Sequence, residues 1–252
     1  MGIYKKIINS KLSYTPKGAG QMTTKEFEIL MNHLGWGDPD AILWTVGIEE
    51  AETWCTDEKS QDLSRVKERI RREFAKKVEP VSEEDPNFPI AYPIAKIACG
   101  VSASYHNWKK EWKDYRRDKL WKEGSKICNI NIYPLGKDSL NSSFPKCYRE
   151  LFGIDNWEDY KKIVKEQRFQ VIQNFYKEKQ PQAVICYGKS HWSEFEEVFK
   201  LHKEKSEDHG DKLTKIYPEK RIILTRHFSV GFRDNTCEFI VEKLKEWNVE
   251  IP

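Results

Sequence analysis

A short segment near residue 50 concentrates carboxylates beside a glycine and a tryptophan. It reads Gly47-Ile48-Glu49-Glu50-Ala51-Glu52-Thr53-Trp54 and directly follows an apolar run, 41–47. A carboxylate in such a place can position a water molecule or a cation. The residues leave one alternative open, an acidic helix N-terminus that the helix dipole favours.

Two asparagines stand in a second apolar run, 126–133. Alternation along a strand places Asn129 and Asn131 on one face and the apolar residues between them on the other. A buried Asn must be hydrogen-bonded, and its amide offers a donor and an acceptor side by side, a pattern that can read the edge of a nucleobase. A structural Asn that ties down a neighbouring loop is equally consistent with the pattern.

Polar residues also follow the other two apolar runs, 182–188 and 221–225. The first continues into Lys189 and Ser190, whose side chains and backbone amides can hold a phosphate. This segment is not a P-loop, because the first glycine of that motif is missing. The second is followed by His227, which can donate a hydrogen bond to a developing anion. The alternatives are an ordinary helix cap and a structural histidine.

All of these residues follow short, β-branched-rich apolar runs that predict buried strands. Helical patterns lie between the runs, at 23–34, 62–78, 108–123, 159–179, 190–200 and 235–247. The alternation predicts an α/β fold, a three-layer sandwich with a four-stranded, mostly parallel sheet flanked by helices. A long helical insertion, about residues 55–125, separates the first two strands. The carboxyl ends of parallel strands meet at one edge, where we expect the polar residues to gather.

The composition is that of one globular domain, residues 1–252. The chain has 43 basic and 40 acidic residues, which excludes a polycationic tail and an acidic disordered chain. No stretch reaches the ~20 apolar residues of a membrane span, and the N-terminus has no apolar signal region, so we expect a cytoplasmic protein without a membrane partner. The six cysteines lack C-x-x-C spacing, which predicts reduced thiols and neither a bound metal nor another cofactor.

Taken together, the four segments resemble the uracil-DNA glycosylase superfamily. Gly47-Ile48-Glu49-Glu50-Ala51 is similar to the first motif of that family, and His227-Phe228-Ser229 to its last, H-P-S. Asn131-Ile132-Tyr133-Pro134-Leu135 is similar to the N-x-x-P-L of the single-strand-selective branch, and Cys186-Tyr187-Gly188-Lys189-Ser190 to the phosphate grip. The match covers roughly residues 38–247 as four segments in the right order. Glu49 stands where the family has Asp, Asn or Ala, and Glu50 and Phe228 replace its usual prolines.

The resemblance implies a monofunctional DNA glycosylase, which flips a nucleotide out of the stack and releases its base without cutting the strand. Glu49 would activate a water molecule, and His227 would hydrogen-bond the leaving base. The base would be bound by Asn131, Asn129, Ala51 and Trp54. The flanking phosphates would be held by Lys189, Ser190, Ser229 and Arg233. DNA is then the partner, and no obligate protein partner is implied.

One small residue, Ala51, bears on the substrate. In the uracil-specific branch a Tyr at this place packs against C5 of the base and excludes a methyl group. Ala51 leaves that side open, so we rank C5-modified pyrimidines, such as hydroxymethylated or glucosylated cytosine, above uracil, with a role in defence against phage DNA. Three alternatives remain: a uracil-specific repair glycosylase, a non-catalytic nucleic-acid-binding module on the same fold, and a metal-dependent nuclease that uses Glu49, Glu50 and Glu52.

Overall fold

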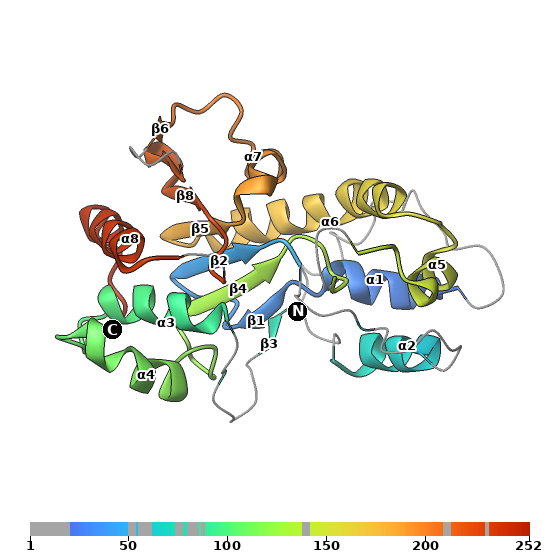
Figure 1. Cartoon of the computed structure of the whole chain (residues 1–252), viewed down its shortest axis with the longest axis horizontal. Coiled ribbons are helices and arrows are strands. Elements are labelled where there is room, and N and C mark those ends of the chain that lie inside the picture. Colours follow the sequence, from blue (N-terminus) through green and yellow to red (C-terminus); the bar gives the residue numbers. More distant parts are fainter. Residues whose placement is uncertain are drawn as a thin grey trace.

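The computed structural model describes residues 21–49, 54, 62–73, 78–79, 86, 89–137, 142–208, 213–229 and 232–252. The described strands form one mixed sheet in the order β3-β1-β4-β2-β5-β8-β7-β6 (Figure 1). The strands are β1 Gly35–Gly37, β2 Leu43–Gly47, β3 Val78–Glu79, β4 Ile127–Asn131, β5 Ala183–Tyr187, β6 Glu207–Asp208, β7 Thr214–Tyr217 and β8 Ile222–Thr225. The α-helices are α1 Thr24–Asn32, α2 Asp62–Glu73, α3 Ala91–Gly100, α4 Trp108–Asp118, α5 Lys146–Phe152, α6 Trp157–Lys179, α7 Trp192–Phe199 and α8 Asp234–Glu246, with short 3-10 helices η1 Lys189–His191 and η2 Pro218–Lys220.

The four predicted strands are the centre of this sheet. Strands β4, β2, β5 and β8 are neighbours, and each adjacent pair is parallel. The prediction of an α/β fold with a mostly parallel sheet is therefore confirmed. The predicted number of four strands is too small, because β1 adds antiparallel to β4 and β7 adds antiparallel to β8. These outer strands are short and carry no apolar run, so their strand conformation comes from pairing with the sheet.

Helices cover both faces of the sheet, and two buried clusters result. Figure 1 shows α6 and α7 on one side of the sheet and α3 and α4 on the other. Val46 and Cys186 point into the first cluster with side chains of α1, α5, α6 and α7. Ile185 and Ile223 point into the second cluster with side chains of α3, α4 and α8. The alternation of strand side chains explains why consecutive apolar residues are all buried.

The predicted insertion, about residues 55–125, contributes to the core. In its described part, α3 is buried along nearly its whole length and packs in the second cluster. Val78, which the sequence predicted to lie in a helix, belongs to β3 and pairs with Gly35. Helix α3 escaped prediction because it is apolar on nearly every face and follows a proline-rich stretch, so it shows no amphipathic period.

A buried arginine, Arg168 of α6, joins the end of α1 to the end of β4. Its guanidinium donates to the carbonyl oxygens of Leu30 (3.0 Å), Met31 (3.2 Å) and His33, and to that of Asn131 (2.7 Å). Burial lowers the pKa of Arg168 to about 10, so the side chain stays charged at neutral pH. This network fixes the point at which β4 leaves the sheet.

Four cysteines, Cys99, Cys128, Cys186 and Cys237, are buried free thiols, as predicted. Cys147 is disulfide-bonded, so the prediction of a reduced thiol is wrong there. Spacing along the chain shows which cysteines can share a local motif and cannot reveal a pairing that the fold creates.

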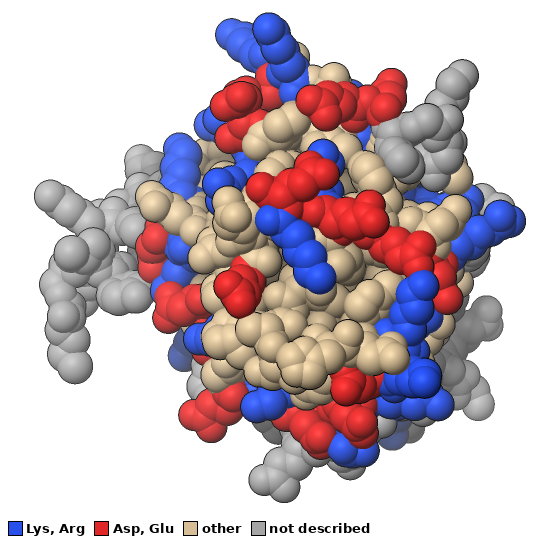
Figure 2. Space-filling view, turned by 90° about the vertical axis from the view of Figure 1, so that its left-hand side faces the viewer, with Lys and Arg blue, Asp and Glu red and all other residues tan. Residues whose placement is uncertain are grey.

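The charged surface is mixed in sign. Figure 2 shows the face at the left of Figure 1, where acidic and basic side chains are interspersed around an uncharged area. The visible charges of this face do not form one basic surface. Among the described helices, none is long and apolar enough to cross a membrane.

Candidate active site

The exits of the central strands meet at one edge of the sheet. The amides of Ile132 and Tyr133 donate to the carbonyls of Gly47 (3.0 Å) and Ile48 (2.7 Å), so pairing of β2 with β4 continues past both strands. Glu49 follows directly on this paired segment. On the other side, the Gly188 amide donates to the Thr225 carbonyl (3.0 Å) and joins the exits of β5 and β8.

Glu49 is a partly buried carboxyl group surrounded by cations. Burial raises its pKa to about 7, against the opposing effect of Lys137, His191 and Lys161. Near neutral pH the group is therefore close to half protonated. A general base works best when its pKa lies near the working pH, so Glu49 is suited to accept and return a proton.

Aromatic side chains hold the loop that carries Lys137. The Tyr148 hydroxyl donates to the Gly136 carbonyl (3.1 Å), and the Lys137 ammonium lies 4.6 Å from the centroid of the Trp157 ring. Burial lowers the pKa of Lys137, whereas the negative charge of Glu49 raises it. The loop thus presents a partly desolvated cation beside the carboxylate.

His227 lies at the exit of β8 and is oriented by its own turn. Its Nδ1 accepts a hydrogen bond from the Ser229 amide (3.2 Å), and the Ser229 Oγ lies 2.7 Å from the same nitrogen. Because an amide N–H points at Nδ1, the neutral ring carries its hydrogen on Nε2. Burial, and next the charge of His191, lower the pKa of His227. The ring is therefore a neutral Nε2–H donor at pH 7.

An aromatic stack shapes the turn that begins at His227. The ring of Tyr187 stacks on Phe228, with centroids 4.4 Å apart, and meets His227 edge to face at 5.5 Å. Phe232 closes the other side of Phe228, edge to face at 4.9 Å. Gly47 has no room for a side chain, because a Cβ there would lie 2.4 Å from the Tyr187 hydroxyl.

The two asparagines of β4 have different surroundings. Asn129 is fully buried, and its Oδ1 accepts hydrogen bonds from Thr45 (2.9 Å) and from the Tyr187 hydroxyl (3.1 Å). Its Nδ2 has no partner among the described residues. Asn131 is the last residue of β4, pairs with Gly47 and keeps 8% of its surface exposed. Asn131 thus lies at the sheet edge, while Asn129 lies two residue pairs deeper.

The proposed phosphate-binding residues lie near the strand exits. Lys189 and Ser190 are exposed in η1, directly after β5 and before α7. Ser229 is exposed beside His227. Arg233 is exposed at the start of α8, after β8. All four side chains are accessible to a ligand.

Trp54 is buried in the first cluster, and Ala51 lies outside the described residues. The Trp54 amide donates to the Tyr148 hydroxyl (2.9 Å), and the Arg69 guanidinium lies 4.5 Å from the centroid of its ring. The sequence predicts that the Trp54 ring stacks on the base. Arg69 already occupies one face of that ring. Glu50 and Glu52 also lie outside the described residues.

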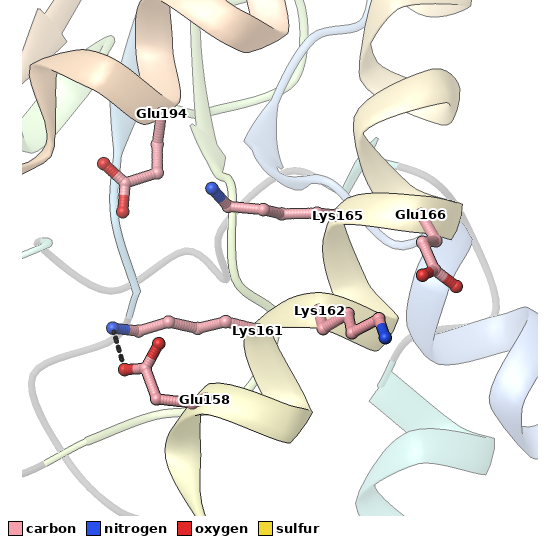
Figure 3. Close-up of a pocket in the computed structure, with 6 residues that line it drawn as sticks. All are labelled: Glu158, Lys161, Lys162, Lys165, Glu166 and Glu194. Carbon is pink, nitrogen blue, oxygen red and sulfur yellow. Dashed lines mark hydrogen bonds and ion pairs between the residues drawn. The ribbon is translucent and has the colours of Figure 1, made fainter.

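A groove of about 290 Å³ opens between α6 and α7. Its lining residues are Glu158, Lys161, Lys162, Lys165, Glu166 and Glu194. Figure 3 shows Lys161 and Lys165 of α6 extending toward the same space as Glu194 of α7. Lys161 also lowers the pKa of Glu49, so the groove adjoins the strand exits.

Sequence reasoning missed several members of this site. His191 stands within the segment after β5, and its Nδ1 lies 3.2 Å from Oε1 of Glu194. Tyr133 is buried after β4 and lies close enough to Glu49 and Glu194 for their charges to raise its pKa, although burial is the larger cause. The helical register of Glu194 relative to His191 was readable from the sequence, while the place of Tyr133 follows only from tertiary packing.

No protein-family model matches this chain, and no curated protein matches its sequence. In the described ranges, no group of three or more His, Cys, Asp or Glu side chains is arranged to hold a metal ion.

Proposed function

We propose that this protein is a monofunctional DNA glycosylase, which hydrolyses the bond between a pyrimidine base and its deoxyribose and leaves an abasic site. One observation supports this most directly. A proton acceptor, Glu49 with a pKa of about 7, and a neutral Nε2–H donor, His227, lie at the same edge of the sheet. Base excision by hydrolysis needs these two functions together.

In the proposed reaction, the C1′–N bond breaks and its electron pair leaves with the base. Negative charge then grows on a base oxygen, to which His227 donates a hydrogen bond through Nε2–H. Glu49 accepts a proton from the attacking water, and its charge stabilises the cationic sugar. The partly buried setting of Glu49 strengthens that electrostatic interaction.

The DNA-binding part of the proposal uses the residues around this pair. The target nucleotide would be flipped out of the stack, and Asn131 at the sheet edge would read the base. The position of Asn129, two residue pairs deeper with its Oδ1 already bonded, supports Asn131 as the reader. Phosphate contacts would come from Lys189, Ser190, Ser229 and Arg233, whose exposure suits this role.

For the substrate, we infer a C5-modified pyrimidine rather than plain uracil. Hydroxymethylated or glucosylated cytosine is the leading candidate, and defence against modified phage DNA is the corresponding role. This inference rests on Ala51 alone, which stands where the uracil-specific branch of the resembled family has a Tyr that packs against C5 of the base. Replacing Ala51 with Tyr would then block the bulky bases and spare uracil.

The test is base release from matched oligonucleotides that carry uracil, 5-hydroxymethyluracil, 5-hydroxymethylcytosine or its glucosylated form. The variant Glu49→Gln should lose ~10²–10⁴-fold in rate, and His227→Ala ~10²–10³-fold, with DNA binding nearly unchanged. Glu242→Gln, an exposed change on α8, is the matched control. Full activity of Glu49→Gln would refute its role, and binding without release of any base would favour a non-catalytic module.

A further inference from the structure

A carboxylate–imidazole pair lies where β5 leaves the sheet. The His191 Nδ1 and the Glu194 Oε1 are 3.2 Å apart, and each side chain is 13% exposed. The hydrogen bond to His191 lowers the pKa of Glu194 to about 2, with a smaller contribution from Ser193. Glu194 is therefore a permanent anion at neutral pH and a fixed acceptor for an Nδ1–H.

The other ring nitrogen of His191 has no such partner. Its Nε2 is buried and makes no hydrogen bond within the part of the chain that the structure describes. Because Nδ1 carries the hydrogen that Glu194 accepts, the neutral ring has its lone pair on Nε2. A buried acceptor of this kind costs free energy unless a ligand or water donates to it.

The place of His191 connects it to both residues of the proposed mechanism. Strand β5 lies between β2 and β8, so its exit is flanked by Glu49 on one side and His227 on the other. A protonated His191 would lower the pKa of both side chains, which places the ring near each of them. Lys137 and Lys161 face the same carboxyl group.

We propose that His191, oriented by Glu194, is the proton acceptor for the attacking water in place of Glu49: its Nε2 takes the proton, while Glu49 holds the water through a hydrogen bond and stabilises the cationic sugar. His191 is the catalytic residue of the pair, and Glu194 is a positioning residue. The inference rests on the proposed glycosylase function and adds to it a base that the resemblance to glycosylases does not supply.

The water oxygen forms a bond to C1′, and the C1′–N bond breaks with its electron pair leaving on the base. One water proton passes to His191 Nε2, and Glu49 accepts the hydrogen bond from the other water hydrogen. The base departs as an anion bonded to His227 and is protonated by solvent. Glu194 lines the groove between α6 and α7, so the imidazolium can return its proton to solvent by a short path.

Two measurements on the full-length protein test the assignment. The first is base release by His191→Ala and Glu194→Ala, with added imidazole as rescue and the exposed His202→Ala as the control. His191→Ala should lose ~10²–10⁴-fold and recover in part with imidazole, since the missing group is a base. Glu194→Ala should retain more activity, because it disturbs only the orientation of the ring. Full activity of His191→Ala would overturn the proposal.

The second measurement does not need turnover. Nitrogen NMR of the imidazole rings should show the Nδ1–H tautomer for His191 and the Nε2–H tautomer for His227. If the parent protein releases no base, the proposed glycosylase function is refuted. The NMR spectra still test whether Glu194 holds the Nδ1–H tautomer of His191. An Nε2–H tautomer for His191 would refute it.

Discussion

Replacing Glu49 with Gln should stabilise the folded protein at alkaline pH. Burial raises the pKa of Glu49 from the ordinary 4.5 to about 7. Between these pH values the folded state binds a proton that the unfolded state has lost, so stability falls as the pH rises from about 4.5 to about 7. Each pKa unit corresponds to 1.36 kcal/mol, and the ionised carboxylate therefore costs the fold about 3 kcal/mol at pH 8. A neutral Gln removes that cost.

The assay is urea unfolding of the parent and Glu49→Gln at pH 5 and pH 8. The difference in unfolding free energy should be about 3 kcal/mol at pH 8 and below about 1 kcal/mol at pH 5, where the buried carboxyl is already protonated. Glu242→Gln, exposed on α8, should change stability by less than about 0.5 kcal/mol at both pH values. A Glu49→Gln difference that is the same at pH 5 and pH 8 would refute the reasoning.

Two further predictions concern DNA binding and base reading. Lys189→Ala should weaken DNA binding and reduce the slope of log affinity against log salt concentration by about 1, because one phosphate contact is lost. The control Lys203→Ala, at an exposed residue, should leave that slope unchanged. Equal slopes for the two variants would show that Lys189 does not contact a phosphate. Asn131→Ala should lose discrimination between bases with little loss of stability. Asn129→Ala should instead lower the free energy of unfolding by about 1–3 kcal/mol, because the Tyr187 hydroxyl loses its acceptor. Unfolding and base-release assays on both variants are the test, and the opposite pattern of effects would contradict these separate roles of Asn131 and Asn129.

The centre of the fold was predictable because its strands carry strong local signals. Apolar runs ending at Gly47, Tyr133, Gly188 and Thr225 become β2, β4, β5 and β8. Strand β1 contains only Gly35-Trp36-Gly37 and takes its conformation from antiparallel pairing with β4. Such pairing depends on residues about 90 positions away, which no local pattern encodes.

The same distinction between local signals and tertiary contacts applies to the candidate site. Glu49 and His227 could be predicted to lie near one another because parallel strands end at a common edge and each residue stands two positions after a strand. The sequence did not predict that Tyr187 and Glu194 lie in this region, because their positions depend on contacts between segments that follow different strands. The order of those strands in the sheet cannot be read from the sequence. Arg69 of α2 lies over the ring of Trp54, and this contact likewise depends on tertiary packing.

Buried polar atoms that lack a hydrogen-bond partner support the strand exits as the location of the site, independently of any sequence motif. Within the described chain, buried polar atoms without a hydrogen-bond partner include Asn129 Nδ2, Tyr133 OH, His191 Nε2 and Thr225 Oγ1. These four belong to a central parallel strand or its exit, whereas others, such as Gln21 Oε1 and Thr214 Oγ1, lie elsewhere; a buried polar atom costs about 1–3 kcal/mol while it stays unpaired. Natural chains keep such local conflicts mainly where function requires them. A water molecule and a base edge would supply both donors and acceptors here, so ligand binding would satisfy atoms that the fold alone leaves unpaired.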